Sequence, residues 1–263
     1  MPHAATLYHP NLFAQLPTLP EALRQRLACG NLSTELPMAA IRALAAGVIL
    51  PPEHYLLAVD LIHLYPDLNR VRLVFPDGMD GVHADEAQRL LDCCRPVFAA
   101  QSMQLLFAQG RHWLLSVPAS HAVTDATTAT SFTDPQRAQG MPLDEAMPKG
   151  EVGRLWRQLI SEIQIELHHA EVNQQRIQKG HMTLNGVWLW GWSTPAECMS
   201  LQDQHVSWMN EAHALEQIEA EMRDAEVLRL CSDAGSWVWQ KKDVWKFWRR
   251  RQAKRAPFVM EIE

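Results

Sequence analysis

The order of apolar patterns between residues 55 and 117 limits this chain to a small number of folds. Two runs rich in β-branched, aromatic and leucine residues, 55–64 and 71–75, are joined by 66–69, whose proline and asparagine suit a turn. An amphipathic helix is predicted over 85–98, and two short runs, 103–108 and 112–117, flank a hairpin-like connection at 109–111. The order strand, strand, helix, strand, strand predicts an α+β fold with a mainly antiparallel sheet and packed helices.

The flanking stretches complete a prediction of five segments. Residues 1–54 are predicted to be a helical entry region, because two runs with helical spacing begin at prolines. Residues 55–117 form the antiparallel α+β unit, and 118–150 are predicted to be a loop or linker without an apolar period. Residues 151–195 hold an amphipathic helix and a Trp-rich strand, and 196–263 form a helical C-terminal extension with a basic tail.

Composition excludes several classes of protein. Among 263 residues, 47% are hydrophobic and 21% are charged, as in ordinary globular proteins. No apolar run approaches the ~20 residues that span a bilayer, so we expect no integral membrane segment. Residues 1–10 show no basic cluster before an apolar run, which predicts no secretory signal peptide and a cytoplasmic location. The five cysteines lack Cys-x-x-Cys spacing and are expected to be reduced thiols.

The helix predicted from residue 151 has two faces of different character. Its apolar face must be buried and consists of Trp156, Leu159, Ile160, Ile163 and Leu167. If the helix continues past His169, a polar stripe forms from Glu162, Glu166, His169, Asn173 and Arg176. Glu166-x-x-His169 has the spacing of di-iron carboxylate helices, but a second copy is missing. A solvated or salt-bridged face is therefore favoured, with an anion or partner contact as the alternative.

The segment 185–191 alternates large apolar residues with glycines, which predicts a short buried strand that enters a tight turn. Trp188 and Trp190 share one face of this strand. Aromatic packing in a core is the favoured interpretation. The alternative is that glycine allows a ligand to approach the backbone beside aromatic walls.

The polar and aromatic positions of this helix and strand resemble a family signature. With the upstream strand Asp60-Leu61-Ile62-His63-Leu64 and Pro66-Asp67, they are similar to the RpfE-like bacterial regulatory proteins, whose members are sometimes labelled cofactor-independent phosphoglycerate mutase. The matching positions are Trp156, Ser161, Glu162, Gln164, His168, Asn173, Arg176, Asn185, Trp188, Trp190, Gly191 and Pro195. The resemblance covers roughly 59–195 and departs at Ala170-Glu171, where the family has His-Pro, and at Trp192-Ser193, which replace two glycines.

This resemblance implies a binding role for the signature positions. The signature cluster consists of Glu162, Gln164, His168, Asn173, Arg176, Asn185, Trp188 and Trp190. The resemblance also implies a non-catalytic regulatory or adaptor protein that binds a protein or nucleic-acid partner. The alternative is a phosphate-handling enzyme related to phosphoglycerate mutase.

The mutase alternative requires a particular set of side chains. Cofactor-independent mutases hold two metals with Asp and His and use a serine nucleophile, because phosphoryl transfer needs charge neutralisation and in-line attack. Asp77-Gly78 resembles the opening of that set, but a turn after a strand explains it, and the later Asp and His elements are not apparent. Walker A, Gly-x-Ser-x-Gly and His-Glu-x-x-His motifs are also absent. The sequence therefore predicts no metal and no cofactor, and it favours the non-catalytic function.

A basic, aromatic tail gives the chain a second candidate binding surface. Residues 241–255 contain eight Lys or Arg and one Asp, on a chain of formal charge −6. The predicted contact residues are Lys241, Lys242, Trp245, Lys246, Trp248, Arg249, Arg250 and Arg251. We expect a protein partner, with single-stranded nucleic acid or a membrane surface as alternatives, since all use cations and aromatic rings. Internal pairing with the acidic helix predicted over 210–230 is the favoured explanation of the tail's charge when no partner is bound.

Overall fold

The computed structural model describes residues 4–10, 12, 20–21, 31–33, 37–49, 52–76, 82–121, 132–201, 204–210, 213–233 and 235–241. The chain divides into two compact units. The insert unit is Pro37–Asp203, and the terminal unit combines Met1–Leu36 with Gln204–Glu263. The five segments proposed from the sequence stay a prediction. Among the described residues, no helix is both long and apolar enough to cross a membrane.

A long central strand organises the sheet of the insert unit. Strand β3 (His54–Asp67) pairs antiparallel with β6 (His112–Pro118), β7 (Gly186–Ser193) and β4 (Arg70–Val74), and β5 (Gln104–Gln109) pairs with β6. Val59 lies between Trp113 on β6 and Leu189 on β7, so residues 56–62 are buried by neighbours on both sides. The α+β class with a mainly antiparallel sheet, predicted from the sequence, is confirmed.

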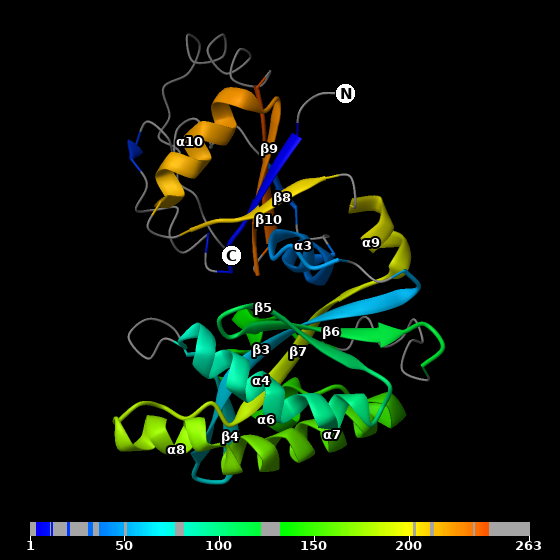
Figure 1. Cartoon of the computed structure of the whole chain (residues 1–263), viewed down its shortest axis with the longest axis vertical. Coiled ribbons are helices and arrows are strands. Elements are labelled where there is room, and N and C mark those ends of the chain that lie inside the picture. Colours follow the sequence, from blue (N-terminus) through cyan, green and yellow to red (C-terminus); the bar gives the residue numbers. More distant parts are fainter. Residues whose placement is uncertain are drawn as a thin grey trace. The chain divides into compact units, whose positions relative to one another are not determined.

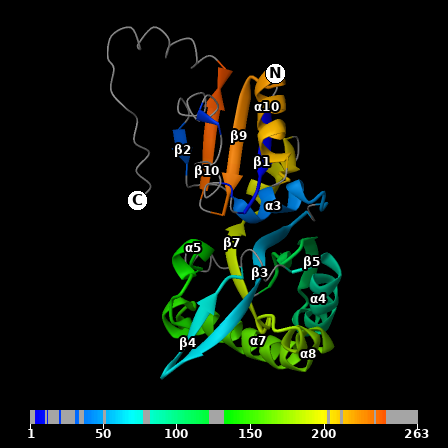
Figure 2. The same ribbon diagram turned by 90° about the vertical axis from the view of Figure 1, so that its left-hand side faces the viewer.

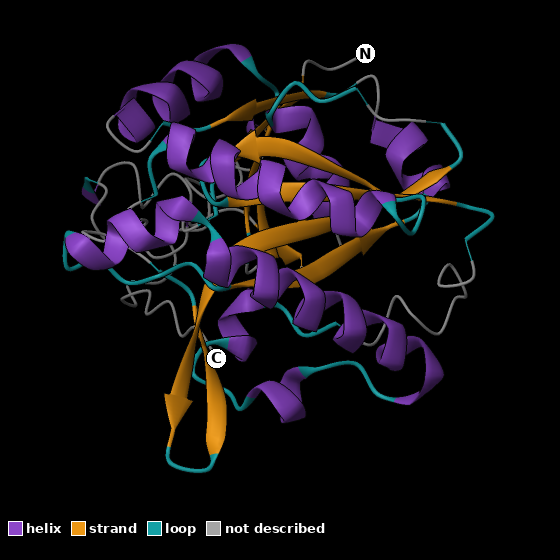
Figure 3. Cartoon of the chain, turned by 60° about the horizontal axis from the view of Figure 1, so that its bottom comes forward, coloured by secondary structure: helices purple, strands orange, loops and turns teal. Residues whose placement is uncertain are grey.

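The second half of β3 and strand β4 form a two-stranded arm that extends beyond the helices (Figure 3). Asp67 pairs with Arg70, which leaves Leu68 and Asn69 as a two-residue turn. The turn predicted at 66–69 is thus present, but it is shorter than predicted, because the paired strands continue to Asp67 and Arg70. Residues 139–142 cover the outer edge of β4, where Leu73 N donates to Met141 O at 3.0 Å and Gly140 N to Leu73 O at 2.8 Å.

Four helices of seven residues or more pack around the insert-unit sheet, in addition to α9 (Pro195–Leu201), which contacts β3 and α3. Helix α3 (Met38–Ala45) contacts β3 and β7, and α4 (Ala84–Ala99) contacts β5 and α7 (Figure 1). Helix α7 (Gly150–His169) buries the predicted face Trp156, Leu159, Ile160, Ile163 and Leu167, and α8 (Glu171–Gln178) follows it. Single-turn helices α5 (Pro135–Ala138) and α6 (Leu143–Ala146) lie in the stretch predicted as a loop, because one turn is too short to show an apolar period.

The helix α7 does not continue as the sequence predicted. Ala170 has extended backbone angles, φ −62° and ψ 128°, and separates α7 from α8. The single polar stripe required one continuous helix, so that prediction is wrong. Asn173 and Arg176 on α8 are buried, whereas Glu166 and His169 on α7 are exposed.

The terminal unit contains a mixed sheet in the order β2-β10-β9-β1-β8. Strand β1 (Ala4–Tyr8) lies between β8 (His205–Trp208) and β9 (Val227–Ser232) and is parallel to both, while β10 (Gly235–Gln240) pairs antiparallel with β9 and with β2 (Asn31–Ser33). Helix α10 (Ala214–Asp224) connects the two outer parallel strands and packs on β9 (Figure 2). The hydrophobic core of the terminal unit includes Leu7, Ile218 and Trp239.

Two expectations for the ends of the chain need correction. The helical entry region predicted over 1–54 contains two strands, β1 and β2, which are too short to show a period and pair with residues about 200 positions away. The described part of the C-terminal extension contains two helices, α9 and α10, and three strands. Of the two apolar runs expected to form helices in this region, the one that begins at Pro37 is present as α3. Most of the earlier run falls in residues 22–30, which lie outside the described residues.

Candidate functional site

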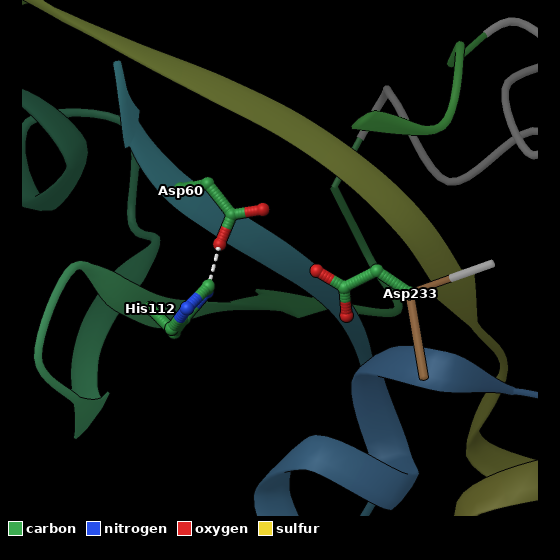
Figure 4. A group of neighbouring side chains, drawn as sticks. All are labelled: Asp60, His112 and Asp233. Carbon is green, nitrogen blue, oxygen red and sulfur yellow. Dashed lines mark hydrogen bonds and ion pairs between the residues drawn. The ribbon is translucent and has the colours of Figure 1, made fainter. Parts of the chain in front are cut away.

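Asp60 is the centre of a buried polar network in the insert unit. Its carboxylate, which is 0% exposed, accepts from Arg42 Nη1 at 2.8 Å, His112 Nδ1 at 2.7 Å and Trp190 Nε1 at 2.7 Å. Figure 4 shows the bond between Asp60 and His112. The Arg42 guanidinium also lies 5.0 Å from the centroid of the Trp190 ring. The network joins α3, β3, β6 and β7.

The charges of this network follow from burial and from the two arginines. Burial by itself would raise the pKa of Asp60, but Arg42 and His112 lower that pKa well below its usual range. Burial, followed by the neighbouring Arg111, lowers the pKa of His112 to about 3. At neutral pH Asp60 is therefore ionised and His112 is neutral, with its Nδ1–H donating to the carboxylate. The ion pair is between Asp60 and Arg42, and His112 adds a neutral donor.

Two residues of the signature cluster hold α8 in place. The Asn173 amide donates to Leu167 O at 2.7 Å and accepts from Leu184 N at 2.8 Å. Arg176 donates to Met182 O at 2.8 Å and forms an ion pair with Glu86 on α4 at 2.8 Å. These buried bonds tie the end of α7 and the chain before β7 to α8.

Asn185 extends β7 with its side chain. Its Oδ1 accepts from Leu64 N at 2.7 Å and its Nδ2 donates to Leu64 O at 3.2 Å, as a further strand residue would. A Cβ on Gly186 would lie 2.7 Å from Leu64 Cδ1, so a larger residue there would require the Leu64 side chain to shift. Trp188 Nε1 donates to Thr133 O at 2.8 Å, and Trp190 belongs to the Asp60 network.

The other three members of the signature cluster lie on α7. Glu162 accepts from Gln158 at 3.0 Å, and the exposed His168 ring makes an edge contact with His169. Gln164 lines a groove between the β3–β4 arm and α7. The structure thus distributes the eight residues over buried bonds and a helix surface. Their assignment as one binding cluster stays a prediction.

A groove of about 760 Å³ lies within the insert unit, between the arm and α7. We call it the arm groove. The arm supplies residues 66–71, and the segment around α6 supplies Leu143, Asp144 and Met147. Helix α7 supplies Arg157, Ile160, Ser161 and Gln164. Apart from Gln164, these positions were not predicted as a site, although the polar residues 157, 161 and 164 recur at the spacing of one helix face.

The carboxyl ends of the parallel strands form a second polar location, in the terminal unit. Tyr8 Oη donates to Asp233 Oδ1 at 2.5 Å, and Asp233 N donates to Pro10 O at 3.1 Å. His9 follows β1 directly and is buried. Open sheets with parallel strands commonly bind ligands at this edge. Sequence reasoning missed it because β1 was not predicted to be a strand.

Among the residues that the structure describes, metal ligands do not gather within either unit. Taken unit by unit, the described residues contain no three ligand atoms from His, Cys, Asp or Glu within 4.8 Å of one another. Burial raises the pKa of Cys198 to about 11 and that of Cys231 to about 12, so both thiols are protonated at neutral pH. The four described cysteines are free.

Only the first residue of the predicted tail surface is described. Lys241 Nζ donates to Arg223 O at 2.8 Å, a carbonyl in the last turn of α10, where a cation is favourable. The other predicted tail contacts lie outside the described residues: Lys242, Trp245, Lys246, Trp248, Arg249, Arg250 and Arg251.

Comparison with known proteins gives partial matches to one class of enzyme. No family model matches the chain. The chain is 28% and 30% identical over 115 residues to the 2,3-bisphosphoglycerate-independent phosphoglycerate mutases of Methanosarcina mazei and Methanosarcina acetivorans, matches that cover 42% of this chain and 26% of each relative. It is 24% identical over 152 residues to a probable enzyme of the same name from Geobacter sulfurreducens, over 57% of this chain and 36% of the relative. The chain therefore spans between a quarter and about a third of these relatives' length.

Two solved structures align with most of the chain at low similarity. A cofactor-independent phosphoglycerate mutase from Thermoplasma acidophilum aligns with a TM-score of 0.40 at 10% identity, covering 91% of this chain and 89% of that one. The PH0037 protein from Pyrococcus horikoshii aligns with a TM-score of 0.45 at 10% identity, covering 91% and 87%.

The sequence matches correct the expected function. The expectation of a non-catalytic regulatory or adaptor protein is wrong, because all three matched relatives are named as phosphoglycerate mutases. The chain has weak sequence similarity to cofactor-independent phosphoglycerate mutases, which agrees with the alternative. These matches give no specific support for the RpfE-like family.

Proposed function

We propose that this chain is a phosphate-handling enzyme related to the cofactor-independent phosphoglycerate mutases. The observation that supports the proposal is sequence identity of 24–30% to three proteins with that name. The proposed substrates are small phosphomonoesters, with 3-phosphoglycerate as the first to test. Membership of the RpfE-like proteins is proposed on the signature residues alone.

The carboxyl edge of the parallel strands in the terminal unit is the proposed reaction site. Asp233 supplies a carboxylate held by the Tyr8 hydroxyl, and His9 supplies an imidazole directly after β1. A carboxylate and an imidazole are groups that accept or donate protons during phosphoryl transfer. The described residues of this unit do not fit a two-metal centre, since they place too few carboxylates and imidazoles together. No metal-dependent step is assigned here.

Other features of the proposal rest on the sequence. A cytoplasmic location is proposed from composition and the absence of a predicted signal. A protein or single-stranded nucleic acid is proposed to bind the basic tail, whose charge supports an anionic contact. The signature cluster is proposed to support ligand binding indirectly, through Asn173 and Arg176, which hold α8 in place.

The test uses the full chain and a panel of phosphomonoesters that includes 3-phosphoglycerate, with and without Mn²⁺. We expect turnover that falls by about 10²-fold or more in Asp233→Asn, because general acid–base groups contribute that much to rate. Asp224→Asn is the matched control, since this aspartate is exposed on α10 in the same unit. Absence of turnover on every ester would refute the function. Turnover that Asp233→Asn leaves intact would refute only the location.

A further inference from the structure

We infer that the arm groove is a binding site for a small organic anion with an apolar segment. This site lies within the insert unit and does not depend on the proposed reaction in the terminal unit. Its volume of about 760 Å³ is within the range of about 300–1,000 Å³ that small-molecule sites occupy.

The polar wall of the groove is one face of α7. Arg157, Ser161 and Gln164 are spaced by four and three residues, so their side chains lie along the same side of the helix. Arg157 Nη1 donates to Pro148 O at 2.6 Å, and Ser161 Oγ donates to Arg157 O at 2.9 Å. The acceptor of Arg157 is a neutral carbonyl, so no described carboxylate offsets this charge.

Gln164 adds an amide without a partner. Its side chain is half-buried in the groove and forms no hydrogen bond with any residue that the structure describes. A half-buried amide that lacks protein partners is available to a ligand, which would replace the water on it. Together Arg157 and Gln164 offer donors that suit a carboxylate or a phosphate.

Two of the acidic residues around the groove already have an arginine partner. Asp67 accepts from Arg72 Nε at 2.6 Å, and Glu145 forms an ion pair with Arg70. Asp144 is also near Arg70 and raises the pKa of that guanidinium, after the larger effect of Glu145. Of the two arginines that line the groove, Arg70 is paired with Glu145, whereas Arg157 has no described carboxylate partner and is the cation that can contact an anion.

The tip of the arm supplies the apolar contact. Leu68 is fully exposed and has φ +32°, a conformation that glycine adopts at lower cost. Leu143, Met147 and Ile160 line the groove as well. A strained, exposed leucine at the mouth of a polar groove is explained if the leucine covers the apolar part of a bound molecule. The ligand is thus an amphipathic anion, and its acid group is a carboxylate or a phosphate.

Calorimetric titration of the full chain with three six-carbon probes tests this inference: hexanoate, hexyl phosphate and hexylammonium. We expect at least one anion to bind at concentrations up to about 10 mM, which a ligand of this size should reach, and hexylammonium not to bind. Preference between the anions identifies the acid group. Arg157→Gln should weaken binding by about 10- to 100-fold, the effect of a lost charge-assisted hydrogen bond.

Three further variants separate binding from folding. Gln164→Ala should weaken binding without lowering the melting temperature, since its amide has no protein partner to lose. Leu68→Gly should weaken binding while leaving the melting temperature equal or higher, because glycine relieves the positive φ. Arg95→Gln, an exposed arginine of α4, is the control and should bind like the parent. Equal binding of hexylammonium, no binding of either anion, or unchanged binding in Arg157→Gln and Gln164→Ala would overturn the inference.

Discussion

Replacement of Asp60 by asparagine should be among the most destabilising single changes in the insert unit. The substitution preserves shape but removes the negative charge that Arg42, His112 and Trp190 share. Arg42 is 0% exposed, so its guanidinium would stay buried without a counter-ion. Removal of one partner of a buried ion pair lowers the free energy of unfolding by about 3–5 kcal/mol, because the other charge stays buried and uncompensated.

That cost is large compared with the total stability of a domain, about 5–15 kcal/mol. For a unit of this size it corresponds to a fall of roughly 6–20 °C in melting temperature, at about 2–4 °C per kcal/mol. Because the chain has two units, we would measure unfolding by hydrogen exchange of β3 amides in the full chain, which reports the insert unit separately.

Two comparisons make the experiment decisive. Asp92→Asn removes an exposed partner of Arg95 and should change stability by less than about 1 kcal/mol. Arg42→Met added to Asp60→Asn should recover part of the loss, because it removes the uncompensated cation. If Asp60→Asn unfolds within about 1 kcal/mol of the parent, or if the double variant is less stable than the single one, the buried charge is not the dominant cost.

Two other predictions concern the same unit. The pKa of His112 is lowered to about 3 from an ordinary value of 6.5, so the unfolded chain binds more protons between these values and stability should fall as pH drops below about 6.5. The slope of the unfolding free energy against pH should approach about 1.4 kcal/mol per pH unit. Denaturant titrations at several pH values would measure this slope. A slope in the parent equal to that in His112→Gln would contradict the lowered pKa of His112. Asn185→Ala should cost about 1–3 kcal/mol, since it leaves the Leu64 N–H and C=O without partners on that side. The control Asn69→Ala, at the turn of the arm, should not lower stability by this amount. Equal melting temperatures for the two variants would exclude the role of Asn185 in extending β7.

Local patterns in the sequence predict the parts of the fold that depend on neighbours along the chain. The apolar face of α7 and the β3–β4 turn follow from spacing of three, four and two residues, and both are present. The break at Ala170 is not marked by proline or glycine, so the helical pattern continued through it. Strand β1 is five residues long and pairs only with β8 and β9, which no local period indicates.

The polar sites show the same limit. Asp60 interrupts an apolar run, which is itself a signal of a buried polar group, but its partners Arg42 and His112 lie 18 and 52 residues away. The arm groove depends on the alignment of α7 with a hairpin more than 80 residues earlier in the chain. Asn173 and Asn185 belong to the signature cluster predicted from the sequence, whereas their backbone partners required the structure.

The division of the terminal unit by the insert unit affects the order of events during synthesis. Ala5 of β1 pairs with His205 and Leu228, so β1 leaves the ribosome about 200 residues before either partner strand exists. At about 5–20 residues per second, this delay is roughly 10–40 s. The insert unit, whose strands pair within its own sequence, has time to fold during that interval. Chaperones that bind extended apolar segments would therefore meet β1 as an unpaired strand on a nascent chain, and the sheet of the terminal unit would be complete only when β10 emerges.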